Sequence, residues 1–134
     1  MRILGLDYGE KHIGIAISDA LDILASSLLT LENKGKDFVS KEIKRICKEK
    51  DISKIVIGLP VSLSGKEEIQ AKKVKEFTEF LKKEINIPIV FEDERLTSVM
   101  ADRFLKEAKI KERKKKEHEL AAQIILQDYL DKKV

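Results

Sequence analysis

The chain has 134 residues, of which 43% are hydrophobic, 38% are charged and 5% are aromatic. This length fits one domain, residues 1–134, that can bury a core without a structural metal, and its single cysteine excludes a disulfide scaffold. No apolar run approaches the roughly 20 residues of a membrane span, so we expect a cytoplasmic protein. The net charge of +3 is too small to indicate nucleic-acid binding by itself.

Three short strand-like runs open the chain. Residues 2–7 and 13–18 are mainly apolar, with a turn at residues 8–11 between them, and residues 25–33 form a third, weaker candidate. The short connections predict an antiparallel meander.

The pattern then changes to alternating helices and strands. Apolar residues at helical spacing predict an amphipathic helix over about 37–50, with Cys47 on its buried face. The run KIVIGL at 54–59 is typical of a covered central strand, whereas 64–67 matches a capping box that begins a second helix. PIVF at 88–91 is the next strand.

Two helical stretches, about 97–108 and 117–131, complete the order β-β-β-α-β-α-β-α-α. This order predicts an α/β fold: a mixed five-stranded sheet, with three antiparallel N-terminal strands, two parallel strands and helices on both faces. It is the layout of the ribonuclease H-like fold, and a flavodoxin-like sheet is the alternative.

The first candidate site residue is Asp7, which ends an apolar strand. A carboxylate is costly to bury there unless it is paired, hydrogen-bonded or bound to a metal. Gly9 and Gly14 follow, and glycines let the backbone approach a neighbour or a ligand closely. The simpler interpretation is a hairpin in which Asp7 caps the turn.

A second acidic group, Asp93 and Glu94 with Arg95, follows the PIVF strand and precedes a helix. Ligands bind at strand ends in open α/β sheets, and adjacent acids tolerate one another when they share a cation. The alternative is a solvated loop in which Arg95 neutralises an acid.

A third group, residues 117–119, precedes two alanines that would let the final helix lie close to the sheet. Either His118 or Glu119 could then reach the strand ends; otherwise the group is a charged first helical turn. Together the three groups form the set of distant carboxylates that a divalent-metal site requires, and such a site can hydrolyse phosphodiester bonds.

Residues 109–116 hold six cations and one acid, a run that can bind phosphates or serve as a solvated face. Its cations are Lys109, Lys111, Arg113, Lys114, Lys115 and Lys116.

Four segments together resemble the successive motifs of the YqgF/RuvX family: GLDYGEKHIGIAISD (5–19), GLPVSLSG (58–65), FEDERLTS (91–98) and HELAAQIILQDYL (118–130). That family is similar to Holliday junction resolvases and is regarded as a family of nucleases for the 5′ end of pre-16S ribosomal RNA. The resemblance implies a ribonuclease H-like fold and phosphodiester hydrolysis dependent on Mg²⁺ or Mn²⁺.

By this resemblance, Asp7 matches the catalytic Asp of the first strand. Glu94 is the expected acid of the D-E-R motif, and Asp93 supports it. His118 stands where the family commonly has Asp, with Glu119 beside it, so either residue is expected to complete the catalytic set. The metal ligands are expected to be Asp7, Glu94 and His118.

Lys11 matches a basic position of the first motif. We therefore expect Lys11, Arg95 and the 109–116 run to contact backbone phosphates. Few aromatic side chains are present to stack on bases, which favours recognition of shape and phosphate.

The expected protein is a metal-dependent endonuclease for structured RNA, such as pre-16S rRNA, or for branched DNA, acting as a monomer or homodimer. One alternative is a non-catalytic RNA-binding module of the same fold, because His118 departs from the family pattern. The D-x-G start also occurs in actin- and sugar-kinase-like ATPases, but those enzymes need two such domains.

Overall fold

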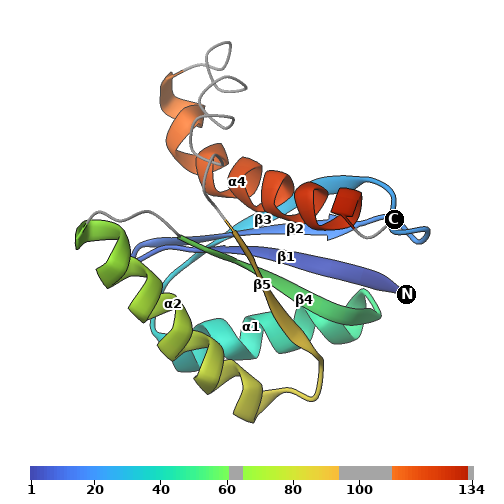
Figure 1. The fold of residues 1–134 in the computed structure, drawn as a ribbon, viewed down its shortest axis with the longest axis horizontal. Helices are drawn as coiled ribbons and strands as arrows, with labels where there is room; N and C mark the ends of the chain where they lie inside the picture. The colour runs from blue at the N-terminus through green and yellow to red at the C-terminus, as the bar shows by residue number, and fades with distance from the viewer. Residues whose placement is uncertain (61–64, 94–109, 133–134) are drawn as a thin grey trace.

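A computed structural model of the chain describes residues 1–60, 65–93 and 110–132. Within these residues one sheet has five strands in the order β3-β2-β1-β4-β5 (Figure 1). The strands are β1 (Arg2–Tyr8), β2 (His12–Ser18), β3 (Ala25–Glu32), β4 (Ile52–Leu59) and β5 (Ile89–Asp93). The pairs β1–β2 and β2–β3 are antiparallel, and the pairs β1–β4 and β4–β5 are parallel.

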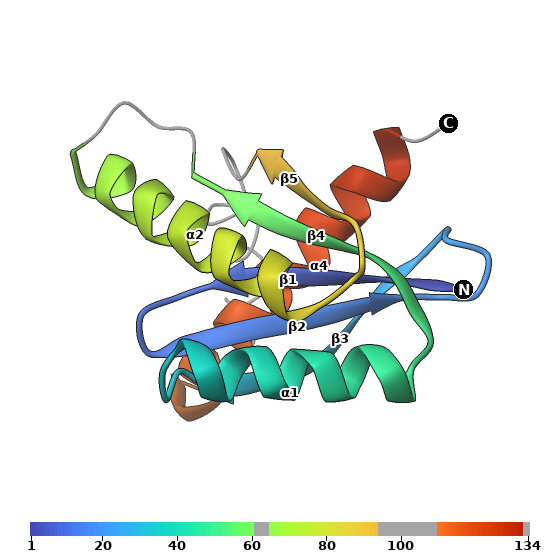
Figure 2. The same cartoon turned by 90° about the horizontal axis from the view of Figure 1, so that it is seen from below.

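Helices cover both faces of this sheet. Helices α1 (Lys36–Glu49) and α2 (Gly65–Glu84) lie on one face, and α4 (Ile110–Lys132) lies across the other (Figures 1 and 2). The predicted mixed sheet with helices on both faces is therefore confirmed. The helix predicted at 97–108 lies outside the described residues. No described helix is both long enough and apolar enough to cross a membrane.

The central strand β1 is buried on both faces, and its alternation assigns each side chain to one of two cores. Leu4 and Leu6 belong to the core beneath α1 and α2. Ile3 belongs to the core beneath α4, and Gly5 and Asp7 follow on that same face. The strand alternation alone therefore directs the Asp7 carboxylate toward α4.

The final helix begins at Ile110, about seven residues earlier than the sequence pattern predicts. The segment 110–116 is rich in Lys, Arg and Glu, which are strong helix formers, and it contains no Gly or Pro. The expectation that 117–119 form the first helical turn is therefore wrong. Further along α4, the buried side chains include Ala122, Ile124, Ile125, Leu126 and Leu130.

Two glycines let α4 lie directly on the sheet. A Cβ atom at Gly14 would lie 1.8 Å from the carbonyl oxygen of His118, and one at Gly5 would lie 2.8 Å from Cβ of Leu126. Both distances are too short for real atoms, so only glycine fits at these two positions. Gly14 is the register partner of Asp7 across β1 and β2. The close approach thus brings residue 118 to the same part of the sheet as Asp7.

We predict that Gly14→Ala destabilises the protein by about 2 kcal/mol or more, because the added methyl group must push α4 off the sheet. Urea denaturation measures this change in the free energy of unfolding. Ser26→Ala, at an exposed position of β3, is the control and should cost less than about 0.5 kcal/mol. A Gly14→Ala protein as stable as the wild type would contradict this packing.

Candidate active site

The site is built around Asp7, the next-to-last residue of β1. Its side chain is only 12% exposed, and its Oδ2 atom lies 2.8 Å from Nδ1 of His118 on α4. Of the two final-helix residues that the sequence left as alternatives, His118 and Glu119, it is His118 that reaches this strand end. Asp7 is thus more than a turn cap, because its carboxylate is paired with a residue 111 positions away in the chain.

The contact with Asp7 raises the pKa of the His118 side chain. The hydrogen bond to Asp7 raises the pKa of His118 above its ordinary value of 6.5, burial opposes the rise, and the charges of Asp7 and Glu117 add to it. The Nδ1–H group donates to Asp7, which fixes the orientation of the ring. Within the described part of the chain, Nε2 has no hydrogen-bond partner.

The two final-helix candidates point to different places. Thr30 donates a hydrogen bond from Oγ1 to Oε2 of Glu119 at 3.0 Å, and Ser27 Oγ donates to the Glu119 carbonyl oxygen at 3.3 Å. Glu119 therefore joins α4 to β3, while its neighbour His118 reaches β1. Successive helical residues diverge by about 100°, which explains the separation.

Two residues that the sequence analysis did not assign to the site enclose the His118 ring. The ring centroids of His12 and His118 lie 5.9 Å apart. A Cβ atom at Gly9 would lie 2.9 Å from Cε1 of His118, so Gly9 provides the space that this ring occupies. Their position in the motif around Asp7 was the available signal, because β1 and β2 form a hairpin.

The second acidic group is only partly described. Asp93 is the exposed last residue of β5, paired in register with Leu59 of β4, while Glu94 and Arg95 lie outside the described residues. The preceding residue, Glu92, is buried and forms an ion pair with Lys132 at the end of α4. Sequence reasoning missed this pair, because only the fold brings β5 and the end of α4 together.

Two lysines lie near the strand end that carries Asp7, and one of them is paired with an acid. Lys11 is exposed in the turn between β1 and β2, and Lys73 of α2 forms an ion pair with Glu10 of the same turn. Gln70 of α2 also donates from Nε2 to the Tyr8 carbonyl oxygen at 2.8 Å, which fixes α2 to this edge.

The structure does not describe the side chains of the 109–116 cations, which are also predicted to contact phosphates. Lys109 lies outside the described residues. The side chains of Lys111, Arg113, Lys114, Lys115 and Lys116, in the first turns of α4, also lie outside them.

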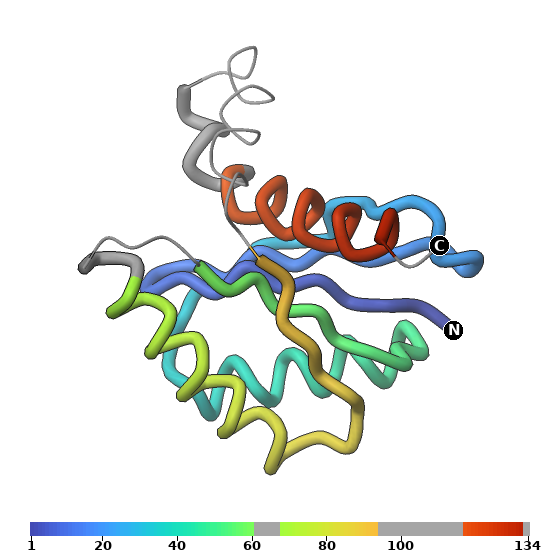
Figure 3. Tube along the Cα trace, viewed as in Figure 1, coloured from blue at the N-terminus to red at the C-terminus, as the bar shows by residue number. Residues whose placement is uncertain are grey.

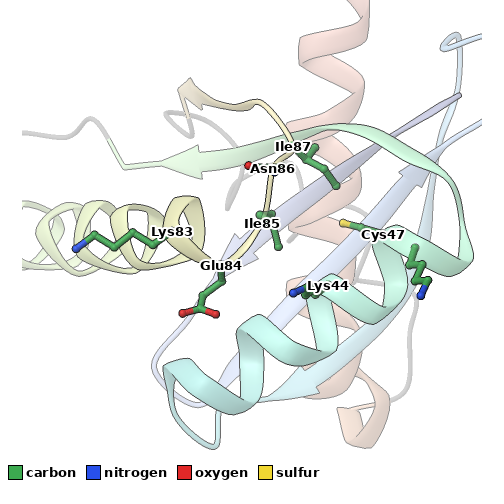
Figure 4. A pocket seen from close by; sticks show the side chains of 8 residues that line it. Lys44, Cys47, Lys83, Glu84, Ile85, Asn86 and Ile87 are labelled. Atoms are coloured by element: carbon green, nitrogen blue, oxygen red, sulfur yellow. The ribbon is translucent and has the colours of Figure 1, made fainter.

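A separate hollow of about 370 Å³ lies between α1 and the segment that follows α2 (Figure 4). It is on the opposite face of the sheet from α4, and none of its lining residues belongs to the predicted site. Cys47 lines it, and burial raises the pKa of this thiol to about 11, so the thiol is protonated and a poor nucleophile at neutral pH. The candidate active site therefore remains at Asp7.

The raised pKa of His118 gives a testable prediction. Without divalent metal, Asp7→Asn should lower the pKa of His118, because the anionic acceptor is removed; titration of the ring by NMR measures this. Since the folded pKa is raised, the stabilisation by the pair is complete below the unfolded pKa of 6.5 and is lost as pH rises through the folded pKa.

The difference in unfolding free energy between wild type and Asp7→Asn should accordingly shrink over that same pH interval. An unchanged His118 titration in Asp7→Asn would contradict the pairing.

Comparisons with known proteins agree with this geometry. A family model for RuvX, described as Holliday junction resolvase, matches residues 1–132. A Dictyoglomus thermophilum protein named "Putative pre-16S rRNA nuclease" is 46% identical over 134 residues, covering 98% of this chain and 96% of its own. A Clostridium acetobutylicum protein of the same name is 44% identical over 133 residues, covering 98% of both chains.

Solved structures share the fold at low sequence identity. Thermus thermophilus RuvC in complex with a Holliday junction substrate has a TM-score of 0.64 at 12% identity, covering 97% of this chain and 94% of its own. Fowlpox virus resolvase with Holliday junction DNA has a TM-score of 0.59 at 12% identity, covering 98% of each chain. These likenesses establish the ribonuclease H-like architecture. Because the family model and close relatives span nearly the whole chain, the chain belongs to the RuvX family, as its motifs predicted.

Proposed function

We propose that this protein is a divalent-metal-dependent endonuclease that cuts structured RNA in the cytoplasm, with the 16S rRNA precursor as its substrate. The observation that carries the proposal is the Asp7–His118 pair, a carboxylate held nearly buried at the end of the central strand by the final helix. Relatives that are 44–46% identical and carry the name "Putative pre-16S rRNA nuclease" support the choice of substrate.

The donor atoms present fit Mg²⁺ or Mn²⁺. Both ions prefer carboxylate oxygens, and Mg²⁺ commonly takes one or two carboxylates and fills its other positions with water and substrate phosphate. No group of three acidic, histidine or cysteine side chains gathers within the described residues. Asp7 and Glu94 are our proposed ligands, with Asp93 in support. A bound ion would supply the positive charge that activates water and stabilises the leaving oxygen.

His118 is proposed as a positioning residue for Asp7. Its Nδ1–H engages Oδ2, which holds the carboxylate in one rotamer and leaves Oδ1 for a cation. This contact favours orientation of Asp7 over direct ligation by His118, while Glu119 has its carboxylate on Thr30 instead. A protonated His118 also adds a positive charge beside the position of an incoming phosphate.

Substrate binding is proposed to depend on phosphate contacts at this edge of the sheet. Lys11 is exposed in the turn after Asp7, and residues 110–116 of the basic run belong to the same helix as His118. Arg95 follows the second acidic group. Cations arranged around a strand end can hold a folded RNA by its backbone, without reading its bases.

A second candidate is cleavage of branched DNA. Fold neighbours solved with Holliday junctions favour it, because the same architecture accommodates a four-way junction in those proteins. The two substrates differ in the 2′-hydroxyl group, so direct competition between them decides which is preferred.

The first functional prediction concerns Asp7. With Mg²⁺ or Mn²⁺, the wild type should cut a pre-16S rRNA fragment, and Asp7→Asn should lower the cleavage rate at least about 100-fold, because a ligand for the activating cation is lost. A four-way DNA junction is assayed in parallel. Asp51→Asn is the matched control, since Asp51 is exposed and precedes β4 at the other end of the sheet. Equal cleavage by wild type and Asp7→Asn would refute the catalytic role.

The second functional prediction concerns the 109–116 run. Replacing its six cations with Gln should reduce RNA affinity and flatten the dependence of log Kd on log salt, because fewer counterions are released on binding. Replacing Lys44, Lys48 and Lys83, which line the hollow on the opposite face, is the control and should leave that slope unchanged. If the slope is unaltered in the six-Gln variant, the run is a solvated face that does not contact RNA phosphates.

A further inference from the structure

The backbone at Gly9 forms part of the surroundings of the His118 ring. A Cβ atom at Gly9 would lie 2.9 Å from Cε1 and 3.5 Å from Nδ1 of His118, and 2.5 Å from the carbonyl oxygen of His12. Only glycine fits there, but glycine leaves the backbone more conformational freedom than any other residue. Contacts from other parts of the chain are therefore needed to hold Gly9 against this ring.

Two side-chain amides supply these contacts. Gln70 Nε2 on α2 donates to the Tyr8 carbonyl oxygen at 2.8 Å, and Asn33 Nδ2 donates to the Gly9 carbonyl oxygen at 2.9 Å. The two carbonyls belong to the planar peptide groups on either side of Gly9, and the orientations of these groups determine its φ and ψ. We call this pair of hydrogen bonds the amide clamp.

Asn33 is itself fixed by three further hydrogen bonds. Its Oδ1 accepts from the Gly35 N–H at 3.1 Å, and its own N–H donates to the Lys11 carbonyl oxygen at 2.9 Å. Nδ2 also donates to the Tyr8 hydroxyl oxygen at 3.3 Å. The Tyr8 ring stacks on Phe77 of α2, with 4.4 Å between the ring centroids. Asn33 therefore connects the turn after β1 to the segment that follows β3 and, through Tyr8, to α2.

The amide clamp lies at the same end of the sheet as Asp7. Figure 3 shows the turn between β1 and β2, the first described turns of α2 and the connection from β3 to α1 together at that end. Asn33 and Gln70 are both partly buried. Each hydrogen bond joins the turn to a different part of the chain, so the loss of either one leaves a peptide group beside Gly9 free to rotate.

The clamp reaches the candidate active site through His118. Cε1 of that ring is bonded to Nδ1, the atom that lies 2.8 Å from Oδ2 of Asp7. If the Gly9 backbone moves away from Cε1, the ring gains room to turn Nδ1 away from the carboxylate. Catalysis is sensitive to such movements, because a displacement of about 1 Å can cost about 100-fold in rate.

We propose that Asn33 and Gln70 are positioning residues for phosphodiester cleavage. This inference rests on the proposed function, in which the Asp7 carboxylate binds the activating cation. The amide clamp holds Gly9 against the His118 ring, and the ring in turn holds the carboxylate in the orientation that cation binding requires. Both amides therefore act on the reaction through Gly9.

Loss of the clamp should affect turnover more than substrate binding. Lys11, the proposed phosphate contact in this turn, is held by the backbone N–H of Asn33, and a change of the Asn33 side chain leaves that donor in place. We therefore expect kcat to fall while KM stays within about twofold of the wild-type value.

The experiment measures kcat and KM on a pre-16S rRNA fragment with Mg²⁺. Asn33→Ser keeps an oxygen for the Gly35 N–H but is too short to reach Gly9, and Gln70→Met removes the amide at similar length and keeps a good helix former. Each variant should lower kcat about tenfold. Kinetics are compared at a temperature at which circular dichroism shows every variant folded. If one of the two variants does not fold, the other decides.

Gln123→Met is the matched control. Gln123 is a partly buried glutamine on α4, and its Nε2 donates to the Ala25 carbonyl oxygen at 3.2 Å. Ala25 pairs with Ser18, at the other end of the sheet from Asp7. The same substitution thus breaks the same kind of hydrogen bond, but it should leave kcat and KM at their wild-type values.

A second measurement reports the position of the ring without metal or substrate. An NMR Overhauser contact between the Gly9 Hα atoms and His118 Hε1 should be present in the wild type and in Gln123→Met. It should weaken in Asn33→Ser and in Gln70→Met. Two amides that only stabilise the fold would leave this contact unchanged in the folded variants.

Several results would overturn the proposal. Wild-type kcat in both clamp variants would do so, as would an equal fall of kcat in Gln123→Met. A raised KM at wild-type kcat would assign the two amides to substrate binding instead. An unchanged Gly9–His118 contact alongside a lowered kcat would also exclude the clamp as the cause.

The proposed function fails on a different readout. If the wild type cuts neither the rRNA fragment nor a four-way DNA junction, the nuclease is rejected, and the NMR contact alone decides whether the clamp positions His118. If Asp7→Asn abolishes cleavage while both clamp variants cut as the wild type does, the nuclease stands and the clamp proposal is wrong.

Discussion

The contact between the backbone of α4 and the glycines of β1 and β2 is the constraint on which the rest of the site depends. A side chain at Gly14 would collide with the carbonyl oxygen of His118, so glycine there sets the distance between helix and sheet. At that distance a histidine reaches a carboxylate on the central strand, and the next helical residue reaches β3 instead. Helix packing therefore determines which of the two adjacent residues, His118 or Glu119, lies beside Asp7.

The two ends of the sheet expose different kinds of residue. The edge at Asp7 has Lys11 and the helix that carries the basic run, whereas the loop at residues 19–24 combines aspartates with exposed apolar side chains. A net charge of +3 averages these regions and hides both.

Most of the architecture could be predicted from the sequence, because strand alternation and helical periodicity are local signals. Asp7 could be named as a candidate from the motif around it, but the sequence left His118 and Glu119 as alternatives, because only the packing of α4 decides which of them reaches Asp7. The start of α4 could not be predicted, because residues 110–116 lack the apolar residues at helical spacing that indicate a helix, although Lys, Arg and Glu are good helix formers. The Glu92–Lys132 ion pair could not be predicted for another reason: it joins two residues that only the tertiary fold brings together. For Gly9 the sequence indicated a close approach, but not that His118 is the neighbour.

We propose that the Asp7 carboxylate binds a divalent cation and that His118 holds this carboxylate in the orientation that binding requires. A crystal structure of the protein soaked in Mn²⁺, with anomalous diffraction, tests this most directly. We predict a manganese peak bonded to the Asp7 carboxylate, with His118 Nδ1 still hydrogen-bonded to Oδ2. An ordered Asp7 bound to His118 at saturating Mn²⁺, with no ion at the carboxylate, would contradict it.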